Sequence, residues 1–75
     1  MPNNDKSLNI AISGTINDYL DRIEGSKIRL IANNFGLEYD DRYDYVKILD
    51  LILCYTGESL GNSIKVLQFI NNDFK

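Results

Sequence analysis

The sequence predicts an all-α fold, a compact bundle of about four short helices. Apolar residues recur at intervals of three and four over most of the chain, which is the period of an amphipathic helix. Glycines stand where these periodic segments end. The 75 residues are 44% hydrophobic, which suits a globular core. This length allows a single helical domain, expected at 7–75, behind a flexible polar tail at 1–6.

The segment after the tail is the one place where the pattern has a period of two. Leu8, Ile10 and Ile12 alternate with small or polar residues over 7–13, which indicates a β-strand. A single strand leaves its backbone groups unpaired, so this one would pair only in a dimer, with the same strand of a second copy. The alternative is an extended or disordered segment.

Two short helices are expected next. Thr15 is a suitable N-cap for the first, and Gly25 a suitable end. Ser26 caps the second, which ends at Gly36 in a Schellman motif with Leu37 as its hydrophobic contact. The expected apolar positions are Ile16, Tyr19, Leu20 and Ile23 in the first helix and Ile28, Ile31, Ala32 and Phe35 in the second.

A longer third helix is expected to begin at Asp40 or Asp41 and to end near Thr56, and a fourth to begin at Ser59 or Asn62. The third is apolar on most faces, which is typical of a helix at the centre of a bundle or at a subunit interface. Because these two helices carry much apolar surface for so small a bundle, we expect a homodimer. Their apolar positions are Tyr45, Ile48, Leu49 and Ile52, widened by Val46, Leu53 and Cys54, and then Leu60, Ile64, Leu67 and Phe74, extended by Val66, Phe69 and Ile70.

Composition argues against several classes of function. The chain has no histidine and one cysteine, so it lacks the commonest general base, an intrachain disulfide and the ligands of a structural zinc site. We therefore expect no catalytic residues, no metal and no cofactor, and we expect Cys54 to be a small buried core residue. No segment is apolar enough for a signal peptide or a membrane span, which favours a cytoplasmic protein. A pI near 4.6 makes binding to nucleic acid or anionic membranes unfavourable.

The stretch 38–45 is the candidate functional site. Its four acids and one arginine sum to −3, which equals the net charge of the whole chain. One interpretation is a solvated helix N-terminus, where acids complement the helix dipole. The other is a binding face for a protein partner with a basic surface, because tyrosines offer rigid contact area and carboxylates steer a cationic surface. Such a face could also imitate the phosphates of nucleic acid. The candidate partner-binding residues are Glu38, Tyr39, Asp40, Asp41, Tyr43 and Asp44.

Two stretches resemble DNA-binding families. Lys6-Ser-Leu-Asn-Ile-Ala-Ile-Ser13, followed by helical periodicity, resembles the first half of a ribbon-helix-helix repressor. That resemblance implies an intermolecular β-ribbon in the major groove, with Asn9 as a base reader. Leu30-Ile-Ala-Asn-Asn-Phe-Gly-Leu37 resembles the first helix and turn of a helix-turn-helix, which implies a recognition helix directly after it. Acids follow instead, and they repel phosphates. A small dimeric transcriptional regulator is therefore the alternative to a protein-binding module.

Overall fold

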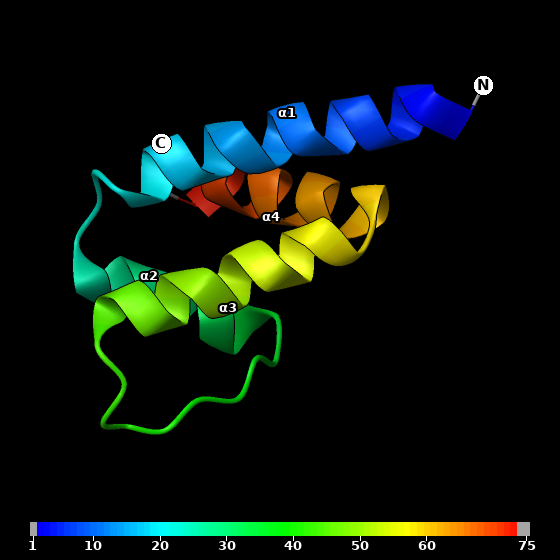
Figure 1. Ribbon diagram of the computed structural model, residues 1–75. Coiled ribbons are helices and arrows are strands. Elements are labelled where there is room, and N and C mark those ends of the chain that lie inside the picture. The colour runs from blue at the N-terminus through cyan, green and yellow to red at the C-terminus, as the bar shows by residue number, and fades with distance from the viewer. Residues whose placement is uncertain (1, 74–75) are drawn as a thin grey trace.

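The computed structural model describes residues 2–73 and shows four helices. They are α1 (Pro2–Leu20), α2 (Gly25–Asn34), α3 (Tyr45–Glu58) and α4 (Leu60–Asp73) (Figure 1). No strand occurs within the described residues, so the predicted all-α bundle is confirmed and the optional N-terminal strand is not found.

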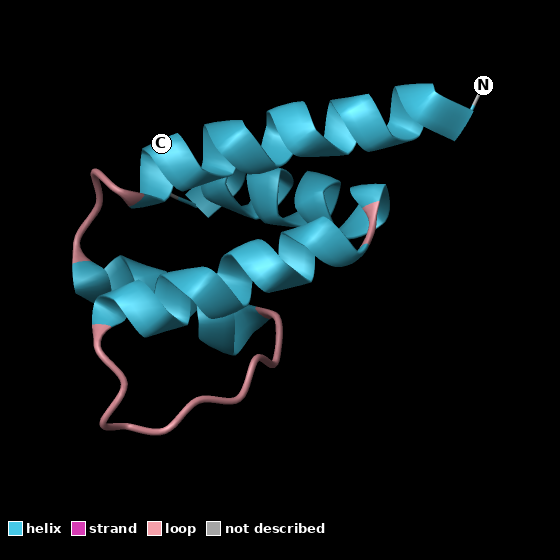
Figure 2. Cartoon of the chain, viewed as in Figure 1, coloured by secondary structure: helices cyan, strands magenta, loops and turns pink. Residues whose placement is uncertain are grey.

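Helix α3 packs against the other three helices, as its nearly all-round apolar sequence predicts for a central helix. Helix α1 lies across α3 and α4, whereas α2 packs mainly on α3 (Figure 1). α1 and α3 run antiparallel, because Ser13 of α1 contacts Thr56 near the end of α3, whereas Leu20 and Val46 line one pocket at the opposite ends. This arrangement leaves the α2–α3 connection on the outside of the bundle (Figure 2).

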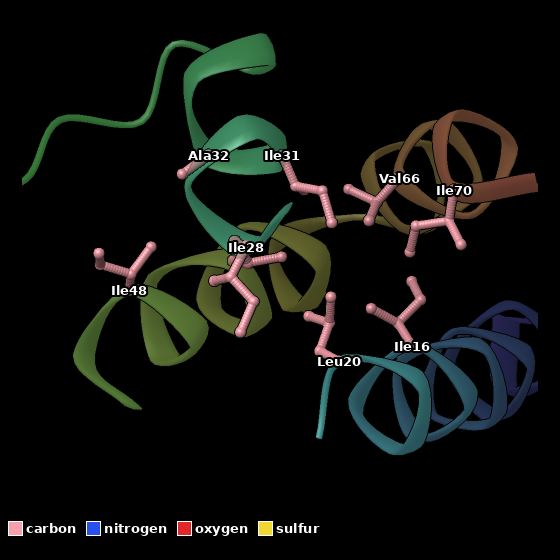
Figure 3. Packing of buried hydrophobic residues seen from close by; sticks show 9 residues of the cluster. Ile16, Leu20, Ile28, Ile31, Ala32, Ile48, Val66 and Ile70 are labelled. Atoms are coloured by element: carbon pink, nitrogen blue, oxygen red, sulfur yellow. The ribbon is translucent and has the colours of Figure 1, made fainter. Parts of the chain in front are cut away.

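One hydrophobic cluster unites all four helices. Figure 3 shows side chains of α1 and α4 pointing toward each other, with those of α2 and α3 beside them. Burial of each large aliphatic side chain in this cluster stabilises the fold by about 1.5–3 kcal/mol, so the cluster holds the four helices together. The buried members are Ile16 and Leu20 of α1, Ile28, Ile31 and Ala32 of α2, Ile48 and Ile52 of α3, and Val66 and Ile70 of α4.

The structure corrects the interpretation of the N-terminal third of the chain. Helix α1 includes residues 2–6, where a flexible tail was expected, and residues 7–13, where a strand or extended segment was expected. Pro2 suits the first helical position, because that residue needs no N–H donor and a fixed φ favours the helix. Thr15 is not an N-cap: it lies inside α1, and its Oγ1 donates to the carbonyl of Ala11 at 3.1 Å.

Polar side chains attach α1 to the rest of the bundle. Ser13 Oγ donates to Thr56 Oγ1 at 3.2 Å, and Thr56 Oγ1 in turn donates to the carbonyl of Leu53 at 2.8 Å. Ser63 Oγ lies 2.6 Å from Asn9 Oδ1 and joins α4 to α1. Thr56 and Ser63 are fully buried, so these bonds satisfy polar groups that water cannot reach.

Helix α2 ends as the sequence predicts. Gly36 has a φ of 69°, in the left-handed region that glycine adopts without strain. The N–H of Leu37 donates to the carbonyl of Ala32 at 3.0 Å, and the N–H of Gly36 donates to that of Asn33 at 3.2 Å. These two bonds are those of a Schellman motif, so that prediction is confirmed. The start of α2 was predicted wrongly, because Glu24 and not Ser26 precedes the helix.

The remaining boundaries and faces agree only in part with the predictions. Helix α1 ends at Leu20 and not near Gly25. Ser59 caps α4 as expected, since its Oγ accepts from the N–H of Asn62 at 3.1 Å. The buried side of α4 is rotated toward Ser63, which leaves Ile64 36% exposed; Phe74 lies outside the described residues.

Candidate functional site

The acidic stretch lies on a loop and not at the start of a helix. Residues 35–44 connect α2 to α3, and the loop projects from the bundle (Figure 2). All six candidate partner-binding residues fall on it, and Tyr45 is the first residue of α3. We call residues 38–44 the acidic loop. The structure thus places the candidate residues together on one exposed connection, where binding residues are commonly found.

Asp44, and not Asp40 or Asp41, caps α3. Its Oδ1 accepts a hydrogen bond from the N–H of Lys47 at 3.0 Å, and its extended backbone precedes the first helical residue. The earlier acids form a turn instead, in which the N–H of Tyr43 donates to the carbonyl of Asp40 at 2.8 Å. The acid nearest the helix therefore satisfies a donor at the N-terminus, as a capping aspartate does.

Asp40 is paired with Arg42. The guanidinium donates Nη2–H to Oδ2 at 2.8 Å and Nε–H to Oδ1 at 3.1 Å, while the backbone N–H of Arg42 donates to Oδ1 at 2.8 Å. The guanidinium and then this N–H lower the pKa of Asp40 from its ordinary value of 3.8. Reciprocally, the carboxylate raises the pKa of Arg42. This pair closes the tip of the acidic loop and neutralises one of its four negative charges.

Arg29 of α2 contacts one tyrosine near the start of the acidic loop and another directly after its end. Its Cζ lies 5.8 Å from the centroid of the Tyr39 ring and 5.3 Å from that of the Tyr45 ring. Each such cation–π contact contributes about 0.5–1 kcal/mol at an exposed site. Tyr39 is half-buried against the core, and its hydroxyl donates to Asn33 Oδ1 at 3.0 Å. These contacts fix the backbone of the loop relative to the bundle.

Three side chains of the acidic loop are exposed to solvent without shaping the loop. Glu38 and Asp41 are exposed and make no hydrogen bond or ion pair with another described side chain. Tyr43 is 36% exposed, and Lys47 Nζ lies 5.2 Å from its ring centroid. The predicted residues thus divide into two groups: Tyr39, Asp40 and Asp44 shape the loop, whereas Glu38, Asp41 and Tyr43 are offered to solvent.

The acids of the acidic loop are not arranged as a metal site. No group of three or more His, Cys, Asp or Glu residues is arranged to hold a metal among the described residues. Both carboxylate oxygens of Asp40 accept hydrogen bonds from Arg42, and Oδ1 of Asp44 accepts from the N–H of Lys47. What the arrangement provides is negative charge and aromatic contact area on a fixed scaffold.

In the part of the chain that the structure describes, the elements that the DNA-binding resemblances imply are not formed. Residues 7–13 are helical, so they provide no β-ribbon, and Asn9 bonds to Ser63 within the bundle. The connection after α2 runs from residue 35 to residue 44, whereas a helix-turn-helix joins its helices by a turn of about 3–4 residues. Within residues 2–73, neither reading element that these two resemblances imply is therefore present.

Two features of the structure were not predicted from the sequence: the exposure of Cys54 and a pocket. Cys54 was expected in the core but is exposed on α3. A pocket between the end of α1 and the start of α3 is lined by Asp21 and Val46. The pattern of hydrophobic residues does not show that these two residues lie close together. No local sequence signal could have suggested this pocket, because it depends on how the end of α1 packs against the start of α3.

No described helix has the combination of length and apolar character that crossing a membrane requires. The chain was also compared with protein-family models, curated proteins and solved structures, and none of them matches it.

Proposed function

We propose that this chain is a small non-enzymatic protein of the cytoplasm that binds another protein through the acidic loop, and that it regulates or inhibits that partner. The observation that carries the proposal is the presentation of Glu38, Asp41 and Tyr43 on a loop whose remaining residues are fixed. A partner with a basic surface complements this charge and gains contact area from the tyrosine.

Preorganisation supports the proposal. The ends of the loop are held by the Schellman motif at Gly36 and by the cap at Asp44, and its tip by the Asp40–Arg42 pair. Ordering a free loop on binding costs about 0.5–1.5 kcal/mol for each immobilised long side chain, and a loop already held avoids part of that cost. The free thiol of Cys54 fits a reducing compartment.

The test compares two variants in affinity capture. The loop variant carries Glu38→Gln, Asp41→Asn and Tyr43→Ala, and each position is exposed and separate from the contacts that shape the loop. The control variant carries Asp18→Asn and Glu58→Gln, which remove the same two charges from exposed helical positions.

Each protein is immobilised and incubated with native lysate at moderate salt, and the bound proteins are quantified by mass spectrometry. We expect a basic partner that the wild type and the control retain and that the loop variant loses at least tenfold. A specific partner retained equally by the loop variant would contradict the proposal. The homodimer expected from the apolar surface of α3 and α4 stays a prediction, to be checked by sedimentation.

A further inference from the structure

Helices α1 and α3 present an outward face built from equivalent positions. On α3, four residues at spacing i, i+4, i+7 and i+11 share one side of the helix. The same spacing on α1 runs on to Asp21, whose N–H donates to the carbonyl of Asn17 at 3.0 Å, and Asp21 and Val46 line one pocket where the two stripes meet. Over eleven residues such a stripe is about 16 Å long, or three helical turns. We call it the α1–α3 face: Ile10, Gly14 and Asn17 of α1 and Asp21 directly after it, with Val46, Asp50, Leu53 and Gly57 of α3.

This face carries the most exposed large apolar side chains described. Ile10 is 66% exposed and Val46 is 65% exposed, compared with 54% for Leu30. Nothing lies within 4 Å of the position that a Cβ would take at Gly14 or Gly57, so the surface is open at both glycines. Small residues let a partner helix approach the backbone closely, as at other helix–helix contacts.

A pocket of about 180 Å³ lies at the Asp21–Val46 end of the face. Aliphatic side chains from three helices, among them Leu20 and Ile28, line it together with Asp21 and Tyr45. Small-molecule sites usually occupy about 300–1,000 Å³, so this volume suits a single inserted side chain rather than a free ligand.

The Tyr45 wall of this pocket is held in place. The ring packs against the backbone of Gly25, where an added Cβ would overlap it, and Arg29 lies against it. The wall is therefore shaped before any partner arrives, which lowers the entropic cost of filling the pocket.

The charged residues of the α1–α3 face are both acidic, and this determines which kind of partner suits it. Asp21 and Asp50 are exposed, and neither takes part in the one ion pair of the described residues, which joins Asp40 and Arg42. None of the eight positions of the face is a lysine or arginine. Two copies paired through this face would bring four carboxylates together without a cation, and like charges at an interface are repulsive. A second copy is thus disfavoured, and a cationic occupant is complementary.

We propose that the α1–α3 face receives a cationic amphipathic helix of the partner, with one apolar side chain in the pocket and a lysine or arginine at Asp21. The inference rests on the proposed function and deepens it, because Asp44 leads directly from the acidic loop into Tyr45 and Val46 of the pocket. One partner thus meets the loop with its basic surface and the pocket with its anchor, in the manner of other helix-in-groove complexes.

A defined probe tests this. A synthetic helical peptide of about 18 residues, five turns, carries leucines at i, i+3, i+4 and i+7, one phenylalanine anchor and lysines elsewhere. A scrambled peptide of the same composition removes the apolar stripe, and a second control replaces lysine by glutamate. Binding to the full chain is measured by fluorescence anisotropy, and the footprint by amide chemical-shift changes in ¹⁵N-labelled protein.

We expect the amphipathic lysine peptide to shift the amides of the α1–α3 face and to bind at least tenfold more tightly than the scrambled peptide. Val46→Asp should weaken it at least tenfold. Asp21→Lys should weaken it similarly and allow the glutamate peptide to bind. Ile64→Asp, at an exposed apolar position on α4, is the matched control and should change the affinity less than twofold.

Three results overturn the inference: equal affinity for the scrambled peptide, shifts confined to residues 38–44, or concentration-dependent self-association through the α1–α3 face. Shifts confined to the acidic loop would leave the proposed function standing. A peptide footprint on the face that persists in the Glu38→Gln, Asp41→Asn, Tyr43→Ala variant would support the groove, whereas the role of the loop fails separately if that variant still captures the partner.

Discussion

The same substitution is expected to have opposite effects at two glycines. Gly36 has a positive φ at the end of α2, whereas Gly14 lies inside α1, and a Cβ would meet nothing within 4 Å at either position. At Gly36 alanine must adopt the left-handed conformation, which costs about 1–2 kcal/mol. Alanine also lowers the conformational entropy of the unfolded chain, which stabilises the folded state by about 0.4–1 kcal/mol. Gly36→Ala should therefore lower the free energy of unfolding by about 1 kcal/mol.

Gly14→Ala should raise the free energy of unfolding by about 0.5–1 kcal/mol, because alanine is the better helix former. For a domain of this size each kcal/mol moves Tm by about 4–8 °C. Thermal and urea unfolding, followed by circular dichroism at matched concentration, measure both changes. The two Tm shifts should have opposite signs. A stabilised Gly36→Ala would refute the Schellman end of α2, and a destabilised Gly14→Ala would refute a helix through the segment that alternates in sequence.

Three further outcomes are expected. Ile52→Ala empties a fully buried site and should cost about 2–5 kcal/mol in urea unfolding; a loss below about 1 kcal/mol would show that α3 is not central. Asp44→Ala should cost about 1 kcal/mol through the lost cap, whereas Asp41→Ala, with no cap to lose, should leave the unfolding midpoint nearly unchanged. Asp40 has a lowered folded pKa, so its pairing stabilises above 3.8 and is lost as the pH falls through that lowered value. Carboxyl ¹³C titration should place its midpoint below 3.8, and Arg42→Ala should return it toward 3.8; an unchanged midpoint in that variant contradicts the pair.

Local signals predicted the ends of several elements. Gly36 and Ser59 each act within a few residues of their own position, so their chemistry can be recognised without knowledge of the tertiary fold. The apolar positions of α2 were also predicted, because Ile28, Ile31 and Ala32 follow the helical period on one face.

The N-terminal segment was predicted wrongly for a physical reason. Leu8 and Ile10 suggested a strand face, but in the structure they flank the bundle and are 49% and 66% exposed. The inward positions of α1 there are Asn9 and Ser13, whose partners are Ser63 and Thr56. A search for apolar periodicity cannot find a buried face made of hydrogen-bonded polar side chains. The same effect hid the rotation of α4 toward Ser63.

The candidate site was located by its composition, but the roles of its residues were not. Several acids in the stretch can each cap a helix, and only the turn closed by Asp40 and Arg42 leaves Asp44 at the start of α3. The position of Arg29 between two tyrosine rings depends on how α2 and α3 pack, which no local pattern encodes. The sequence therefore predicts where the acidic residues lie, whereas the fold determines which of them are engaged in hydrogen bonds and which are exposed without a partner among the described residues.

The central claim is that a basic protein binds the acidic loop. The most direct measurement is the amide chemical-shift footprint of the purified, captured partner on the ¹⁵N-labelled chain, repeated as salt is raised. We expect shifts at residues 38–44, centred on Glu38, Asp41 and Tyr43, and an affinity that falls as salt screens the charges. A footprint that spares the acidic loop, or an affinity that does not respond to salt, would contradict the account.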